Sequence, residues 1–388
     1  MSATAAASRF THVLALPGPS ASRPGHERAT LGWVATQVAR ILALPFAGFA
    51  DAAPDQPGRP YLVPQDTLVA GDATRWNITD DGALLGGAVP HAFVASKLIT
   101  HALVSPAAAA PAGWQPGLGE AMREVTFAGF SVFAADDLRE ACRRLFDAGG
   151  AARVKLADGI GGGGQHVVRD VAAAAALLRT LTAAQIEAGI VVEAEVADAA
   201  TYSVGEMRLG GRAIAYVGTQ GLSTGRDGRP VYGGSTLSVV RGRMPDLLDV
   251  FRQPRLRRTV EMAIAYDRAA QAAYPALLCS RRNYDVLWGS DSHGNPHGGV
   301  LEQSWRVGGA TPAELAAFDL LEREPALSRV IASTVERHGP VHVPAHAEVY
   351  CVLDDPRCGL ITKFRHAGPD IDAPLRLGES DGSTPLDA

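Results

Sequence analysis

Residues Arg153–Val168 read RVKLADGIGGGGQHVV, and this stretch decides the fold. Apolar residues frame Lys155, five glycines fall within the nine residues 157–165, and a β-type run resumes at Val167. Glycine loses more backbone entropy on folding than any other residue, so a dense glycine run contributes little to a core. It does offer backbone N–H groups that approach an anion closely, with a lysine at the strand end to meet its charge. The pattern therefore predicts a phosphate-covering loop between two strands.

Other glycine motifs fit this stretch less well. Residues 159–164 satisfy the pattern G-x-G-x-x-G, but the dinucleotide-binding fold needs a helix that begins on the glycines. Here residues 165–168 predict a second strand, and helical periodicity begins only after Asp170. The Walker pattern is excluded because no Gly-Lys-Ser/Thr follows the loop. A flexible hairpin tip without a ligand is the remaining alternative.

Composition describes an ordinary globular protein and narrows its partners. The chain has 388 residues, 47% hydrophobic and 20% charged, which is enough for two or three domains. A net charge of −5 without a basic run gives no reason to expect nucleic acid or a membrane as a partner. The four cysteines lack metal-site spacing, so we expect a cytoplasmic protein without a zinc site or disulfide framework. The N-terminus lacks the pattern of a signal peptide.

The order of the expected elements predicts an N-terminal α/β layer and a larger region after it. A strand at residues 11–16 and a helix at residues 27–44 indicate the first unit of a parallel layer. A short helix is expected at residues 91–103, carrying Lys97.

A later hairpin carries the second informative pattern. Its turn, at residues 292–295, lies midway between Asp285 and Glu302, so symmetric pairing places these carboxylates opposite each other on one face. Like charges directly opposite on a sheet are destabilising, and a divalent cation such as Mg²⁺ is the simple compensation. Ser304 and Arg306 follow at the two-residue period and share this face. The alternative is a solvated polar face on which Arg306 neutralises Glu302.

From about Ser96 to Thr311 the chain resembles the ATP-grasp superfamily, with the motifs in the order that this family uses. The segments that carry the resemblance are two lysines, the glycine loop, a hinge strand and a metal strand: Lys97, Lys155, residues 159–164, residues 192–196 (VEAEV) and residues 301–310 (LEQSWRVGGA). One departure is Ser304, which stands where the family usually has asparagine, and a second metal ion would be held weakly there.

The resemblance implies a role for each of these residues. The ATP-binding set is Lys97, Lys155, Gly159, Gly161, Gly162, Gly163, Gly164, Glu193, Ala194 and Val196, with Glu193 at the adenine. The set for Mg²⁺ or Mn²⁺ is Asp285, Glu302 and Ser304. Arg306 and Lys155 are the implied catalytic residues, which stabilise the transferred phosphoryl group.

The implied fold is α+β and has three parts. An ATP-grasp domain at residues 96–312, itself divided into 96–189 and 190–312, lies between an N-terminal α/β domain (1–95) and a C-terminal extension (313–388). The implied function is Mg²⁺-dependent ligation, in which ATP activates a carboxylate as an acyl phosphate that an amine or other nucleophile attacks. The implied partners are these two small molecules, and a homodimer is left open.

Two alternatives to this function remain. One is a carboxylase-like or kinase-like ATP-grasp enzyme that uses another acceptor. The other is a regulatory protein that binds the nucleotide without turnover. The serine at position 304, in place of the family's usual asparagine, suggests this alternative.

Two weaker candidates lie near the C-terminus. Three histidines recur every four residues: His338, His342 and His346. Prolines between them forbid a helix, so a metal site is not expected there. Lys363 and Arg365 lie on an apolar stretch, and they face either the substrate or the solvent.

Overall fold

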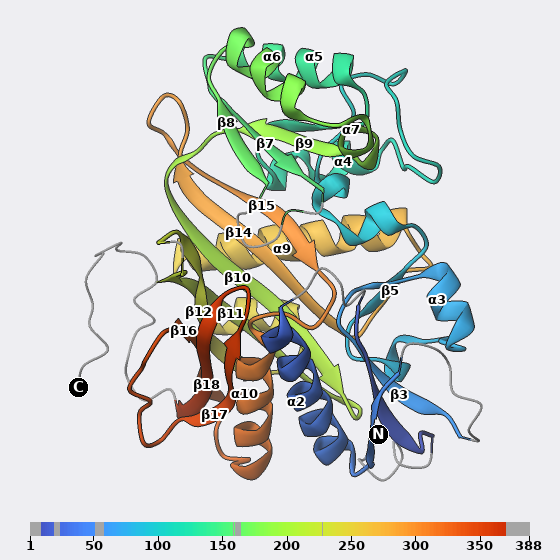
Figure 1. Cartoon of the computed structure of the whole chain (residues 1–388), viewed down its shortest axis with the longest axis vertical. Helices are drawn as coiled ribbons and strands as arrows, with labels where there is room; N and C mark the ends of the chain where they lie inside the picture. The colour runs from blue at the N-terminus through green and yellow to red at the C-terminus, as the bar shows by residue number, and fades with distance from the viewer. Residues whose placement is uncertain are drawn as a thin grey trace.

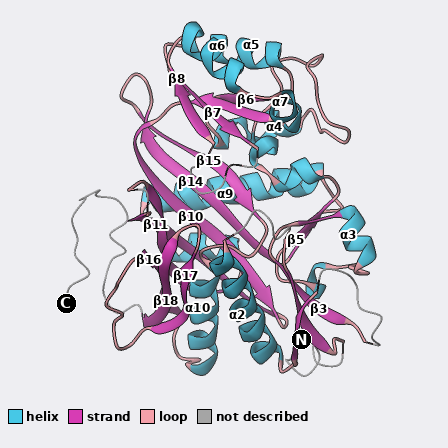
Figure 2. Cartoon of the chain, in the orientation of Figure 1, coloured by secondary structure: helices cyan, strands magenta, loops and turns pink. Residues whose placement is uncertain are grey.

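The computed structural model describes residues 9–18, 24–50, 58–157, 159, 164–226 and 228–369. Figures 1 and 2 show a mixed α+β protein in which a large twisted sheet occupies the centre. A small sheet with its helices lies at one end, and the N-terminal layer packs beside the large sheet (Figure 1). The expected α+β fold is confirmed.

The N-terminal layer is a parallel three-stranded sheet of order β2-β1-β3. Its strands and the helix that covers them are β1 (His12–Leu16), α2 (Gly25–Leu42), β2 (Phe46–Phe49) and β3 (Pro60–Pro64). Helix α2 buries an apolar stripe that includes Leu31, Val34 and Val38, as its 3.6-residue periodicity predicts. It ends at Ala43, whose left-handed conformation lets its N–H meet the last carbonyl groups. The predicted parallel α/β unit is confirmed.

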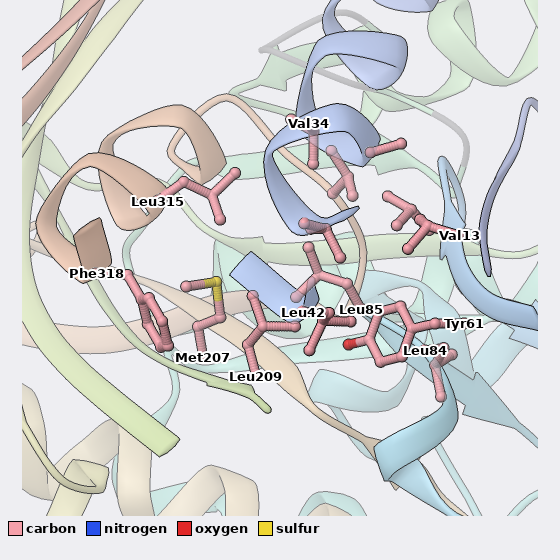
Figure 3. Packing of buried hydrophobic residues seen from close by; sticks show 14 of the residues in the cluster. Val13, Val34, Leu42, Tyr61, Leu84, Leu85, Met207, Leu209, Leu315 and Phe318 are labelled. Atoms are coloured by element: carbon pink, nitrogen blue, oxygen red, sulfur yellow. The ribbon is translucent and has the colours of Figure 1, made fainter. Parts of the chain in front are cut away.

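One hydrophobic core joins this layer to the large sheet. Figure 3 shows Leu42 of the layer beside Met207 and Leu209 of the large sheet, and Val13 and Val34 belong to the same cluster. Leu315 and Phe318, from helix α10 (Thr311–Arg323), complete the same cluster. Shared burial of this kind fixes the N-terminal layer against the sheet, because separating the two would expose apolar surface to water.

The small sheet has four strands in the order β6-β9-β7-β8. The strands and their covering helices are β6 (Gly129–Val132), α5 (Ala135–Asp147), β7 (Ala152–Leu156), β8 (Gln165–Val168), α6 (Val171–Thr180), α7 (Ala183–Ala188) and β9 (Ile190–Ala194). Strands β7 and β8 pair antiparallel and flank the glycine loop, as the sequence predicted. Asp170 caps α6, because its side chain accepts a hydrogen bond from the N–H of Ala173.

The large sheet has eight strands in the order β15-β14-β10-β11-β12-β16-β18-β17. Their bounds are β10 (Ala197–Leu209), β11 (Arg212–Thr224), β12 (Pro230–Arg241), β14 (Arg281–Ser290), β15 (Pro296–Ser304), β16 (Arg329–His338), β17 (Glu348–Asp355) and β18 (Gly359–Pro369). Side chains alternate between its two faces. On β10, Tyr202 and Val204 pack in a core with helix α9 (Pro254–Ala273), whereas Ser203 faces a cleft.

Shorter elements connect these layers. A further three-stranded sheet contains β4 (Leu68–Val69), β5 (Gly87–Val89) and β13 (Leu278–Cys279). Further short helices and 3-10 turns in the described residues include α3 (Ala70–Arg75), η2 (Asp81–Ala83), α4 (Leu118–Met122), η5 (Arg123–Val125), η6 (Met244–Asp246) and α8 (Leu247–Val250).

The prediction of a helix at residues 91–103 is wrong. The chain instead forms two 3-10 turns, η3 (Ala92–Ala95) and η4 (Lys97–Thr100), separated by an extended residue at Ser96. The Ser96 hydroxyl donates to the carbonyl of Phe93 at 2.8 Å and accepts from the N–H of Leu98. A serine that bonds to the neighbouring backbone in this way competes with the helix and breaks it.

Candidate active site

The β14–β15 hairpin brings two carboxylates together. Asp285 pairs directly with Glu302 in the strand register, with a bulge immediately after Asp285. This juxtaposition confirms the pairing that the sequence predicted. The bulge increases the local bend of the strands and re-aims side chains, a feature common beside functional sites.

Asp285 accepts hydrogen bonds from three donors, and its pKa is nevertheless raised. Its Oδ1 accepts from Gln220 Nε2 at 2.8 Å, from Asn283 Nδ2 at 2.9 Å and from the Ser203 hydroxyl at 3.4 Å. Burial, and then the charge of Glu302, raise the pKa of Asp285 to about 6 despite these bonds. An aspartate with a raised pKa that lies opposite a second, partly exposed carboxylate fits a hard divalent cation, since such ions prefer carboxylate oxygens.

Lys97 joins the carboxylate pair to the glycine loop. Its ammonium group is buried, donates to the Gly159 carbonyl at 2.7 Å and lies 3.2 Å from Glu302 Oε2. Residues that are far apart in sequence therefore converge at one cation. A lysine between the glycine loop and the strand that carries Glu302 can meet a polyphosphate chain.

Lys155 and Glu193 form a buried ion pair between β7 and β9. Glu193 also lies 3.2 Å from His101 Nε2, and both carboxylate partners are almost fully buried. Burial opposes ionisation of Glu193, but Lys155 and His101 outweigh it and lower the pKa of Glu193 to about 2. The carboxylate of Glu193 is thus ionised and occupied by internal partners. His101 was missed, because a single histidine in sequence carries no sign of its partner.

A cleft of about 660 Å³ lies over the large sheet. Of the residues expected at the site, six line it: Lys97, Gly159, Asp285, Glu302, Ser304 and Arg306. Five others from the expected set that the structure describes lie outside this lining: Lys155, Gly164, Glu193, Ala194 and Val196. Gly164 closes the loop, since its carbonyl accepts from the N–H of Leu156 at 3.0 Å. Gly161, Gly162 and Gly163 lie outside the described residues.

A network of buried polar side chains, which the sequence did not predict, is hydrogen-bonded to Asp285 through Asn283. Arg281 forms two bonds to Glu314, at 2.6 and 3.0 Å, and both side chains are almost completely buried. The Tyr216 hydroxyl lies 2.6 Å from Glu314 and 2.9 Å from Asn283 Oδ1, whose amide donates to Asp285. Arg281 also donates to backbone carbonyls at the end of β15. Helix α10 is thereby linked to the carboxylate pair through hydrogen bonds.

The cleft also extends to the C-terminal strands. Lys363, which the sequence left between substrate and solvent, is buried, lines the cleft and lies 3.0 Å from Glu336. Arg365 instead pairs with Glu348 at 2.8 Å. His338 lines the cleft, whereas His346 packs against another histidine ring.

Across the described residues, no group of three or more histidine, cysteine, aspartate or glutamate side chains is placed to hold a metal ion. None of the helices in the described ranges is long and apolar enough to span a membrane.

Comparison with solved structures finds similar arrangements at low sequence identity. D-alanyl-alanine synthetase A from Vibrio cholerae has a TM-score of 0.46 and 12% identity, covering 78% of this chain and 90% of that one. The D-cycloserine synthetase DcsG has a TM-score of 0.43 and 15% identity, covering 76% and 92%. An ATP-grasp RimK domain protein from Sphaerobacter thermophilus has a TM-score of 0.37 and 11% identity, covering 75% and 90%. All three TM-scores are below 0.5.

Comparison of the sequence gives the family. No curated protein matches the chain. A family described as "Protein of unknown function (DUF3182)" matches residues 14–365, which is most of the chain. The chain therefore belongs to the DUF3182 family.

Proposed function

We propose that the protein is an ATP-dependent ligase of the ATP-grasp type, which activates a carboxylate for attack by an amine or another nucleophile. The observation that carries the proposal is the position of Lys97, whose ammonium lies between Gly159 of the glycine loop and Glu302 of the carboxylate pair. Glu302 and Asp285 are opposite each other in the same cleft. This set offers an ammonium group to a polyphosphate and carboxylate oxygens to a divalent cation.

The carboxylate pair fits Mg²⁺ by its chemistry. Asp285 and Glu302 would hold the ion, and Ser304 would add a weaker oxygen ligand. Bound Mg²⁺ neutralises charge on the ATP phosphates. Asp285 must be ionised for this role; burial and then the charge of Glu302 raise its pKa, and a bound cation would offset both effects.

The proposed reaction has two steps. In the first, an oxygen of the substrate carboxylate attacks the γ-phosphorus of ATP, and ADP leaves with the electrons of the broken P–O bond. In the second, the nucleophile attacks the acyl carbon, and inorganic phosphate leaves as the acyl–oxygen bond breaks. Lys97 and Arg306, both in the cleft lining, would stabilise the charge that develops on the phosphoryl oxygens.

The base of ATP would lie near the hinge between β9 and β10. We propose that the backbone of Ala194 and Val196 meets the adenine. Because Glu193 is paired with Lys155 and His101, we propose that its main contribution is to fix Lys155 beside the glycine loop. The domain limits at residues 95 and 312 remain predictions.

The test traps the intermediate. An acyl phosphate reacts with hydroxylamine to give a hydroxamate, so the protein is incubated with ATP, Mg²⁺, hydroxylamine and a panel of carboxylic acids. We expect ADP and hydroxamate to form in equal amounts with at least one acid, and Glu302→Gln to abolish both. Asp291→Asn, in the exposed turn of the same hairpin, is the matched control and should retain both.

Two results would count against the proposal. ATP binding without ADP release on any acid would favour the regulatory alternative, in which the nucleotide is bound but not consumed. ADP release without hydroxamate would favour a kinase-like acceptor that forms no acyl phosphate.

A further inference from the structure

A band of polar side chains crosses the large sheet on its cleft face. It starts at Asp285 on β14, continues through Ser203 and Gln220, and ends at Glu336 and Lys363 on β16 and β18. Register pairs link its members, because Asp285 pairs with Ser203 and Glu336 pairs with Lys363. All of these residues line one continuous cleft. The cleft therefore has a second end, remote from the carboxylate pair.

This second end contains a buried ion pair that faces the cavity. Lys363 is 3% exposed and Glu336 is 9% exposed, and their charged atoms are 3.0 Å apart. A buried ion pair contributes little net stability, since desolvation of the two charges offsets their attraction. Its position in the cavity lining suggests a role in binding.

The opening beside this end is basic. A second cavity of about 480 Å³ shares Val231, His338 and Cys358 with the cleft. In the described part of the chain its lining adds two arginines, Arg226 and Arg357, and no carboxylate. At this end the two linings together hold three cationic side chains, Lys363, Arg226 and Arg357, and two carboxylates, Glu336 and Glu27, and the excess of positive charge favours an anionic group.

The distance between the two ends limits the size of the substrate. Four steps separate β14 from β16 in the strand order. At about 4.8 Å per step, the path along the sheet from the carboxylate pair to the remote end is about 19 Å, which is the upper limit of the straight distance because the sheet twists. A molecule that contacts both ends therefore has to extend across several strands.

We propose that the substrate is an elongated acid with a second anionic group at its far end. This inference rests on the proposed function. One carboxylate would lie beside Asp285 and Glu302 for activation, and the distal anion would meet Lys363 and the arginine-lined opening. Ser203, Gln220 and Ser235 would line the middle of the bound molecule with polar groups.

The test compares acids by length and by charge. Mg²⁺ and a non-hydrolysable ATP analogue saturate the full chain, and calorimetry then measures binding of α,ω-dicarboxylates of increasing length. Monocarboxylates of the same length serve as the reference. We expect long dicarboxylates to bind about tenfold more tightly than their monocarboxylate counterparts, and short ones to show no preference.

Three variants test whether the remote end causes the preference for long dicarboxylates over monocarboxylates. Arg226→Gln should reduce this preference about threefold, as expected for an exposed ion pair. The double change Lys363→Gln with Glu336→Gln removes both buried charges together and should abolish it. Arg229→Gln, on the same hairpin but outside both cavity linings, is the control and should keep it.

The outcomes separate this inference from the proposed function. Normal binding of the ATP analogue with no preference for long dicarboxylates would overturn the inference alone. A preference that survives in Arg226→Gln and in the double variant would overturn it as well. Failure of the wild-type chain to bind the nucleotide would instead refute the proposed function. If the double variant does not fold, Arg226→Gln, at an exposed position, decides the question.

Discussion

Replacing Asp285 with asparagine should stabilise the protein at neutral pH and remove its Mg²⁺-dependent nucleotide binding. The exchange keeps the shape of the side chain and an oxygen that can accept from Gln220 and Asn283. It removes a negative charge that is buried opposite Glu302. A neutral amide is also a poorer ligand for a hard cation. Stability and binding are therefore expected to change in opposite directions.

The expected gain in stability of Asp285→Asn follows from the raised pKa of Asp285. Burial, and then Glu302, raise the pKa of Asp285 from 3.8 to about 6. This shift of about two units corresponds to about 3 kcal/mol, at about 1.4 kcal/mol per unit. Between pH 4 and 6 the folded chain holds the proton that the unfolded chain has lost, so wild-type stability falls as the pH rises through this range. The variant lacks this fall, and its advantage should grow from near zero at pH 4 to about 3 kcal/mol above pH 6.

Chemical denaturation at a series of pH values measures the effect. Mg²⁺ and ATP should raise the unfolding free energy of the wild type and leave that of the variant unchanged. Asp291→Asn is the control, since backbone N–H groups of Asn295 and then His293 lower the pKa of Asp291. That variant should lose stability at neutral pH and keep the response to Mg²⁺–ATP. An Asp285→Asn variant that is less stable than wild type at pH 8, or that still responds to Mg²⁺–ATP, would refute the reasoning.

Three further predictions test neighbouring contacts. Lys97→Met should weaken binding of Mg²⁺–ATP at least tenfold in calorimetry, because one charge-assisted contact contributes about 1.5–3 kcal/mol; an unchanged affinity in a folded variant contradicts its role between Gly159 and Glu302. Tyr216→Phe should lower the unfolding free energy by about 1–3 kcal/mol in urea denaturation, since a hydroxyl that bonds Glu314 and Asn283 is lost in a buried site; a change near zero would show that the network is not intact. Binding of Mg²⁺–ATP at pH 6 should release protons from the buried aspartate, measured as a dependence of the calorimetric heat on the ionisation enthalpy of the buffer; equal heats in all buffers would argue against that carboxylate as a ligand.

Local patterns were enough for the parts of the site that are close in sequence. The glycine run predicted the loop between β7 and β8, and the turn spacing predicted that Asp285 pairs with Glu302. Both features are hairpins, in which the position of the turn sets the register of the strands. The apolar stripe of α2 and the strand–helix order of the N-terminal layer were also predicted, because both can be read from residues that are close together in the sequence.

The local pattern failed where side chains compete with the backbone. Apolar spacing at residues 91–103 suggested a helix, yet Ser96 bonds to its neighbours and leaves two 3-10 turns. Lys97 owes its position to this break, since it begins the second turn.

Tertiary structure alone decided which charges meet. The pairing of Lys155 with Glu193 and the contact of Lys97 with Glu302 join strands and turns that are distant in sequence. The C-terminal strands enter the large sheet beside β12, which brings Lys363 into the cleft. No local pattern specifies these contacts, because the order of strands in a sheet is set by packing and long-range hydrogen bonding across the whole chain. The sequence determined the loop and the carboxylate hairpin, and the assembled sheet determined the cleft that surrounds them.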